Sequence, residues 1–139
     1  MVVDTNILLY ATNPDSPHHQ VCRDRLAQLR AGSRAWYVTW GNLYEYLRVA
    51  THPAITAHPA ATAEAWAYLR ELVGSARMLT ETDRHADLFQ QLLRKHSWIS
   101  ANLVFDARTV VLMKENGVRR ICTFDRDFRR FDGIEVVAP

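Results

Sequence analysis

The stretch VVDTNILL, residues 2–9, joins a short apolar run to an acid and then to a helical turn. Val2 and Val3 are β-branched residues that favour a strand, and this strand is predicted to stop at the carboxylate of Asp4. The apolar residues that begin at Ile7 fall in a helical turn, which Asn6 is expected to cap. Asp4 is therefore predicted to lie at the carboxyl end of a strand, directly before a helix.

The rest of the chain continues this alternation of short apolar strands with longer amphipathic helices. Further strands are expected at residues 35–39, 76–79, 120–123 and 134–137. Helices are expected at residues 18–29, 61–73, 83–96 and 101–116, and one more is expected directly after a cap at Thr39, carrying Leu43 to Ala50. This alternation is typical of a parallel sheet flanked by helices, so the predicted fold class is α/β. Ligands of such sheets bind outside the carboxyl ends of the strands, where Asp4 and Asp125 are both expected.

Composition narrows the class of protein further. The chain has 139 residues, 48% hydrophobic and 23% charged, with 5 Gly and 5 Pro, which predicts one globular domain over residues 1–139 and excludes repeat arrays and disorder. No apolar run reaches the roughly 18 residues of a membrane span, and no signal peptide is recognised, so a cytoplasmic protein without membrane contact is expected. Cys22 and Cys122 lack metal-ligand spacing and are expected in the core.

Two further acids are expected near the same edge of the sheet. Glu45 lies close to the start of the helix that follows the second strand, and Asp106 lies in a strongly apolar helix. Each acid alone could be a helix cap, a surface charge or half of an ion pair. Four converging carboxylates, however, repel one another by about 4 kcal/mol per pair at 4 Å and an effective dielectric of 20. A hard divalent cation removes that repulsion, and oxygen ligands favour Mg²⁺ or Mn²⁺ over zinc.

Arginines and aromatic residues accompany the acids. Five arginines surround the last acid, at positions 119, 120, 126, 129 and 130. They form either a solvated loop with Arg–Asp pairs or a grip on the phosphates of a nucleic acid, for which Arg126 and Arg129 are the candidates. Most of the aromatic residues are expected in the core, whereas Trp40 and Tyr44, close to Glu45, could stack on unpaired bases.

The acids occur in four sequence blocks: VVDTNILL around Asp4, NLYEYLRVATHP around Glu45, NLVFDA around Asp106 and TFDRDF around Asp125. In order and spacing these blocks resemble those of the PIN-domain ribonucleases, and most closely those of the VapC toxins of bacterial toxin–antitoxin pairs. The resemblance implies an α/β/α sandwich with a central parallel sheet of about five short strands. It also implies an acidic quartet of Asp4, Glu45, Asp106 and Asp125, an auxiliary acid at Asp127, and orienting neighbours at Asn6 and Thr123.

The same resemblance implies a function. The chain is expected to be a Mg²⁺-dependent endoribonuclease, with Mn²⁺ as a possible substitute, and the toxin of a type II toxin–antitoxin system. Asp4, Asp106 and Asp125 would bind the metal, and Glu45 would complete the ligand set or accept a proton from the attacking water. The implied partners are a VapB-type antitoxin, an RNA substrate and a second copy of the chain.

Other protein classes fit the sequence less well. A phosphoryl-accepting receiver domain needs a lysine at the end of a late strand, but Lys95 and Lys114 both fall in predicted helices. A haloacid-dehalogenase-like phosphatase needs Asp-x-Asp after its first strand, and Asn6 stands at the second position. A catalytically silent PIN fold that binds RNA or protein, and a DNA-directed PIN nuclease, both stay open.

Overall fold

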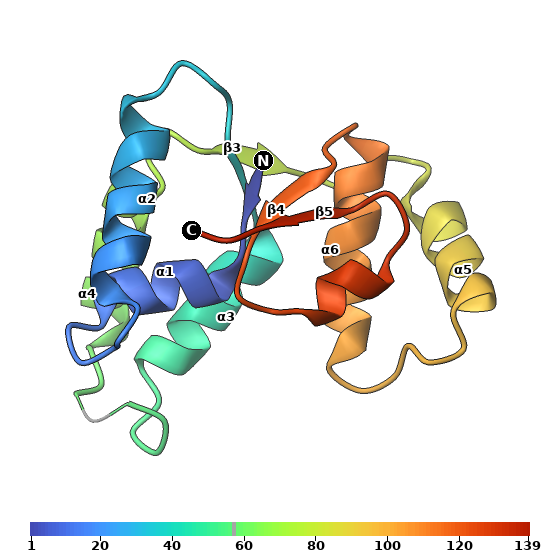
Figure 1. Ribbon diagram of the computed structural model, residues 1–139. Coiled ribbons are helices and arrows are strands. Elements are labelled where there is room, and N and C mark those ends of the chain that lie inside the picture. Colours follow the sequence, from blue (N-terminus) through green and yellow to red (C-terminus); the bar gives the residue numbers. More distant parts are fainter. Residues whose placement is uncertain (57) are drawn as a thin grey trace.

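A computed structural model describes residues 1–56 and 58–139, and at its centre lies a five-stranded sheet (Figure 1). The strands are β1 (Val2–Val3), β2 (Tyr37–Thr39), β3 (Arg77–Leu79), β4 (Arg120–Cys122) and β5 (Glu135–Val137). They lie in the order β3-β2-β1-β4-β5, and every neighbouring pair is parallel. The predicted α/β class, with a parallel sheet of about five short strands, is confirmed.

The helices are α1 (Thr5–Thr12), α2 (His19–Ala31), α3 (Trp40–Ala50), α4 (Thr62–Leu72), α5 (His85–Lys95) and α6 (Leu103–Glu115), with a 3₁₀ helix η1 at Asp127–Arg130. The sequence-based bounds differ from these by at most two residues at each end, because the terminal residues act as caps or turns. The sequence did not predict η1. Within the described residues, no helix has the length and apolar character needed to cross a membrane.

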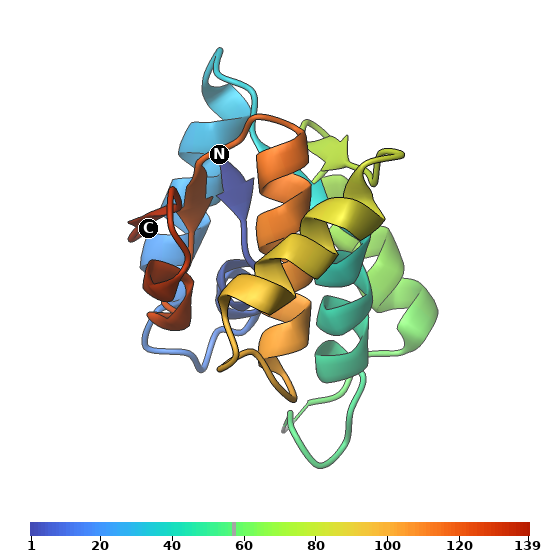
Figure 2. The same ribbon diagram turned by 90° about the vertical axis from the view of Figure 1, so that its right-hand side faces the viewer.

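Helices cover both faces of the sheet, as the two perpendicular views show (Figures 1 and 2). Val3 and Cys122 point to one face, where they pack with the buried residues of α1, α2, α3 and α4. Val2 and Ile121 point to the other face and pack with α5, α6 and η1. This alternation follows from the two-residue period of a strand. The result is a three-layer α/β/α sandwich.

The strand order decides where a ligand can bind. The chain passes from β1 outward to β2 and β3, and then returns to β4 and β5 on the other side of β1. Val3 of β1 is in register with Cys122 of β4, so the loops that leave these two neighbouring strands diverge from the same edge. Such a switch point opens a crevice at the carboxyl ends of the strands. Asp4 and Thr123, the first residues after the two strands, lie there.

Candidate active site

Asp4 is fixed at the carboxyl end of β1 by three hydrogen bonds. It is the N-cap of α1, where its Oδ1 accepts a bond of 2.7 Å from the backbone N–H of Thr5. Its Oδ2 accepts bonds from the side-chain amide of Asn6 at 2.8 Å and from the hydroxyl of Thr123 at 2.6 Å. The prediction that Asn6 caps α1 is therefore wrong. Asp4 takes that role because it stands one position before the first helical residue, while Asn6 holds the Asp4 carboxylate.

Thr123 connects the loops after β1 and β4. Its hydroxyl is buried, donates to Asp4, and accepts from the Asn6 amide at 2.9 Å and from the Asp125 backbone N–H at 2.9 Å. Asp125 in turn accepts a bond of 2.8 Å at Oδ1 from the backbone N–H of Asp127, the first residue of η1. A continuous set of hydrogen bonds thus runs from β1 to η1. It fixes the backbone that presents two of the predicted site acids.

Asp106 lies in the first turn of α6. Burial raises the pKa of Asp106 to about 7, and the charges of Asp125, Asp4, Glu45 and Asp127 contribute to the rise. Burial also raises the pKa of Asp4 to about 6, against the hydrogen bonds that it accepts, and the charges of Glu45 and Asp125 act in the same direction. In residues 1–56 and 58–139 no hydrogen bond or ion pair compensates the Asp106 carboxylate. The structure therefore brings the predicted quartet into one electrostatic group.

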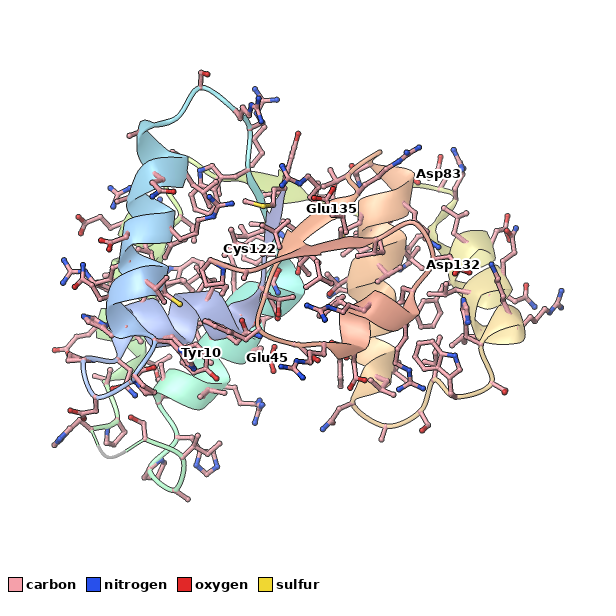
Figure 3. All side chains as sticks on the ribbon, viewed as in Figure 1. Tyr10, Glu45, Asp83, Cys122, Asp132 and Glu135 are labelled. Carbon is pink, nitrogen blue, oxygen red and sulfur yellow. The ribbon has the colours of Figure 1, made fainter. Side chains whose placement is uncertain are left out.

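Glu45 is the most open member of that group. It projects from α3 with 52% of its side chain exposed, and its Oε1 lies 3.9 Å from Nη2 of Arg48. Glu45 is one of the side chains labelled in Figure 3. An exposed ion pair at this distance is weak. Glu45 is therefore free to turn toward the crevice, which suits a residue that completes a ligand set or takes up a proton.

The acidic group fits a divalent cation in its donor chemistry. Its donors are carboxylate oxygens, which suit Mg²⁺ and Mn²⁺. Within the part of the chain that the structure describes, however, no three His, Cys, Asp or Glu side chains lie close enough together to hold a metal ion as they stand. Carboxylates that raise one another's pKa repel one another, and this repulsion favours rotamers that keep them apart. To bind a divalent cation, the carboxylates would have to move closer together. The cation would attract each of them, and this attraction would replace the repulsion that keeps them apart.

The arginines near η1 divide into two kinds. Arg130 lies over the ring of Trp98, 3.8 Å from its centroid, and its Nη1 is 3.4 Å from Oδ1 of Asp127. Arg130 therefore has a structural role. Arg126 and Arg129 are exposed, and no ion pair of either is found in the described residues. These two predicted phosphate contacts remain available to a ligand.

Aromatic rings at the start of α3 form an exposed stack. Trp40 is 41% exposed and Tyr44 is 64% exposed, with ring centroids 5.6 Å apart and planes inclined by 25°. Trp66 of α4 lies 6.4 Å from Trp40 on a nearly parallel plane. Trp36 and Tyr46 are buried, as expected. Phe105, next to Asp106, is 70% exposed, although an apolar residue in a helix is normally expected to be buried.

A buried polar contact that the sequence did not reveal joins α1 to α3. The Asn42 amide donates to the Thr5 hydroxyl at 3.2 Å, while Oδ1 of Asn42 accepts from both the backbone N–H and the hydroxyl of Thr39. The spacing Thr39-x-x-Asn42 is that of a capping box and indicated the local part of this contact. The contact to Thr5 depends on the fold. It ties the helix that carries Glu45 to the helix that Asp4 caps.

Comparisons with known proteins agree with this architecture. The family model of the PIN domain matches residues 1–134. Ribonuclease VapC48 of Mycobacterium tuberculosis is 30% identical over 138 residues, which cover 98% of this chain and 94% of that protein. The crystal structure of Mycobacterium tuberculosis VapC20, titled a sarcin–ricin loop cleaving toxin, has a TM-score of 0.72 at 21% identity and covers 99% of this chain and 98% of its own.

A second solved structure, VapBC2 from Rickettsia felis bound to a DNA fragment from their promoter, has a TM-score of 0.67 at 13% identity, with 99% and 96% of the two chains covered. At these identities the two solved structures support the fold alone. The family match and the VapC48 relative both extend over nearly the whole chain, and they confirm the resemblance drawn from the four acidic blocks. The chain belongs to the PIN-domain family and, within it, to the VapC ribonucleases.

Proposed function

We propose that the protein is a Mg²⁺-dependent endoribonuclease that hydrolyses RNA phosphodiesters with water as the nucleophile, and that it acts as the toxin of a type II toxin–antitoxin pair. The observation that supports this most directly is Asp106. Its pKa is raised to about 7 by burial and by the neighbouring carboxylates, and within the described residues it has no cationic partner. A nuclease that relies on a divalent cation needs a group of acids in this state.

Each site residue has a distinct task in this proposal. Asp4, Asp106 and Asp125 would hold Mg²⁺, or Mn²⁺ in its place. The cation would supply a lowered pKa for the attacking water and would neutralise charge on the phosphoryl and leaving oxygens. Glu45, the exposed acid, completes the ligand set or accepts the proton that the water loses. Asn6 and Thr123 orient Asp4 through the hydrogen bonds described above, and Asp127 is the auxiliary acid.

Substrate contacts come from the rim of the crevice. Arg126 and Arg129 bind the phosphates next to the scissile bond, since exposed guanidinium groups form paired hydrogen bonds with phosphate oxygens. Trp40, supported by Tyr44, offers a ring face to an unpaired base. Both contacts favour single-stranded or looped RNA, in which bases are free to stack on a protein surface.

A toxin of this class requires a partner that silences it. We infer that a VapB-type antitoxin binds this chain, that the chain forms a homodimer, and that both act in the cytoplasm. VapBC2 from Rickettsia felis, one of the structurally similar proteins above, is such a toxin–antitoxin pair. Light scattering coupled to gel filtration, on the chain alone and with its co-expressed antitoxin, tests both associations. A monomer at every concentration would contradict the homodimer.

The decisive experiment maps the ends of RNAs cut by the purified protein. With Mg²⁺ we expect internal cleavage that leaves 5′-phosphate and 3′-hydroxyl ends, because water and not the 2′-hydroxyl attacks. Excess EDTA should abolish the cleavage. Asp87→Asn, an exposed acid on α5, is the matched control and should cut like the wild type. Cleavage that persists in EDTA, or a cyclic phosphate product, would contradict the mechanism.

The same assay separates the alternatives. A single-stranded DNA of identical sequence is added in a parallel reaction. Cleavage of the DNA with intact RNA would make the protein a DNA-directed PIN nuclease. Binding of RNA or antitoxin without cleavage of either nucleic acid, under conditions in which an active VapC ribonuclease cuts, would make it a catalytically silent binding module.

A further inference from the structure

A second polar region lies at the amino edge of the sheet, at the opposite end of the strands from the acids. A hollow of about 710 Å³ lies among three arginines: Arg25 of α2, Arg34 in the loop before β2, and Arg120 at the start of β4. Within the described residues, no Asp or Glu lines this hollow. We call it the arginine hollow. The sequence did not predict it, because the three arginines come from separate elements.

Arg25 is a partly buried cation with weak partners. Its Nη1 lies 3.4 Å from Oε1 of Gln28, and its Nη2 lies 3.7 Å from the sulfur of Met1. Its Nε is buried without a hydrogen-bond partner in the described residues. A guanidinium has five N–H donors, and buried charges are normally paired. Arg25 therefore lacks the strong acceptor that a cation in this position requires.

The other two arginines do not supply that acceptor. Arg34 is exposed and forms no ion pair in the described part of the chain. Nε of Arg120 lies 3.0 Å from Oε1 of Glu135, and both side chains of this pair are about half exposed. One solvent-exposed carboxylate thus stands against three guanidinium groups. The hollow carries an excess of positive charge.

A second hollow in the protein does not share this positive charge. A larger hollow of about 820 Å³, between α1, α3 and α4, is lined by Asp15 and Glu64, and within the described residues by no Arg or Lys. Two hollows of similar size in one small protein therefore have opposite charge. The arginine hollow is the one that suits an anion.

We propose that the arginine hollow binds a phosphate group. Guanidinium groups form paired, charge-assisted hydrogen bonds with phosphate oxygens, and a phosphate would give Arg25 its missing acceptor. The volume falls within the range of about 300–1,000 Å³ that is usual for small-molecule sites, so the phosphate can carry a nucleoside. The phosphate is supplied either by a small free ligand or by the backbone of an RNA. The second source rests on the proposed function, and the first does not.

Binding is tested first with inorganic phosphate, by calorimetry and thermal melting of the full chain in EDTA. We expect a saturable rise in Tm with phosphate, but not with chloride at the same ionic strength. Arg34→Gln, an exposed loop substitution that leaves the core intact, should weaken the affinity about tenfold, and Arg25→Gln at least as much. Arg23→Gln, an exposed arginine on the same helix outside the hollow, is the control and should bind like the wild type.

Asp106→Asn should also bind phosphate like the wild type, so a failure of the proposed nuclease leaves this result unchanged. The source of the phosphate is then tested by RNA binding. If RNA occupies the hollow, Arg34→Gln weakens the binding of a long RNA and lowers its salt slope by about one, while a tetranucleotide binds as before. If only the phosphate titration responds, the ligand is small. Wild-type protein with no saturable phosphate binding, together with an Arg34→Gln variant of unchanged RNA affinity, would overturn the proposal.

Discussion

The two edges of the sheet carry opposite charges and hold them in different ways. At the carboxyl edge, Asp4 accepts three hydrogen bonds and the buried Thr123 links it to the loop of Asp125. At the amino edge, the partners of Arg25 within the described residues are weak acceptors: the Gln28 amide oxygen, the Met1 sulfur and the Cys122 thiol. Figure 3 shows the two ends, with Glu45 near the first and Glu135, at the start of β5, near the second. The first edge is built to position charges, whereas the second leaves them under-satisfied.

The direction of the helices explains why the carboxyl edge is negative and the amino edge positive, but not how many charges each edge carries. Helices α1 and α3 begin at the carboxyl edge, capped by Asp4 and Thr39, and a helix N-terminus favours negative charge. Helix α2 ends at Gly32, which lines the arginine hollow, and a helix C-terminus favours cations. A terminus carries only about half an elementary charge. It cannot neutralise several carboxylates or three guanidiniums, so each edge calls for a counter-ion.

The largest expected effect is that of Asp106→Asn, which keeps the shape of the carboxylate and removes its charge. Cleavage of RNA should fall at least about 100-fold. The metal-free protein should be as stable as the wild type or more stable, because a repelled and poorly solvated charge is lost. The rise in Tm on addition of Mg²⁺ should shrink. Cleavage assays, and thermal melts in EDTA and in Mg²⁺, measure all three.

An Asp106 held by a buried arginine would behave in the opposite way. Its substitution would leave that cation unpaired and destabilise the metal-free protein by about 3–5 kcal/mol. A destabilisation of that size, with an unchanged response to Mg²⁺, would remove Asp106 from the site. It would also remove the contrast between the two edges, since both would then consist of ordinary ion pairs.

The carboxyl edge could be predicted in outline because its signals are local. A β-branched run that stops at Asp4, and Thr39 as the cap of the next helix, are visible in a few residues of sequence. The contact between Thr123 and Asp4 is not, because 119 positions separate them and only the pairing of β1 with β4 brings them together. The arginine hollow was missed for the same reason. Arg25 and Arg34 are polar residues with no local signal of a shared site.

The pH dependence of stability in EDTA provides a second test. The pKa of Asp106 is about 7 and that of Asp4 about 6 in the folded protein, both above the ordinary aspartate pKa of 3.8. Between about pH 4 and pH 7 the folded protein therefore binds more protons than the unfolded chain. Its free energy of unfolding should fall as the pH rises through this range. Urea unfolding midpoints across this window measure the fall. Asp106→Asn and saturating Mg²⁺ should each reduce it.

Glu115 serves as the control of opposite sign. Burial raises its pKa, but hydrogen bonds with His85 and Thr82 outweigh burial, and the net shift is downward. Its contribution is present above the pKa of an unfolded glutamate and is lost as the pH falls through the folded value. Glu115→Gln should therefore leave the fall between pH 5 and 7 in place. A wild-type midpoint that rises across this window in EDTA would show that the acids at the carboxyl edge are paired.

Thr123→Val tests whether the carboxyl edge is positioned by its hydrogen bonds. Valine has a similar shape but leaves the Asp125 N–H without its acceptor and removes one donor from Asp4. We expect a loss of about 1–3 kcal/mol in the free energy of unfolding, and roughly 10- to 100-fold in cleavage. Thr109→Val, at a half-buried threonine on α6 whose hydroxyl makes only a solvent-exposed hydrogen bond to the Phe105 carbonyl, should change stability by less than about 0.5 kcal/mol. Equal effects of the two substitutions would show that Thr123 only fills space.

The smallest expected effect belongs to Glu135→Gln at the amino edge. The Arg120–Glu135 pair is about half exposed on both sides, so its removal should change the free energy of unfolding by less than about 1 kcal/mol. It also removes the carboxylate that competes with a phosphate for Arg120, and the affinity for inorganic phosphate should therefore rise about two- to threefold. Cleavage of a short RNA should stay at the wild-type rate, because Glu135 lies at the far end of the strands from the acids. Chemical unfolding, phosphate titration and the cleavage assay together decide the point. A lower phosphate affinity in Glu135→Gln would mean that Glu135 holds Arg120 in place for the ligand. A cleavage defect like that of Asp106→Asn would mean that the two edges of the sheet form one site.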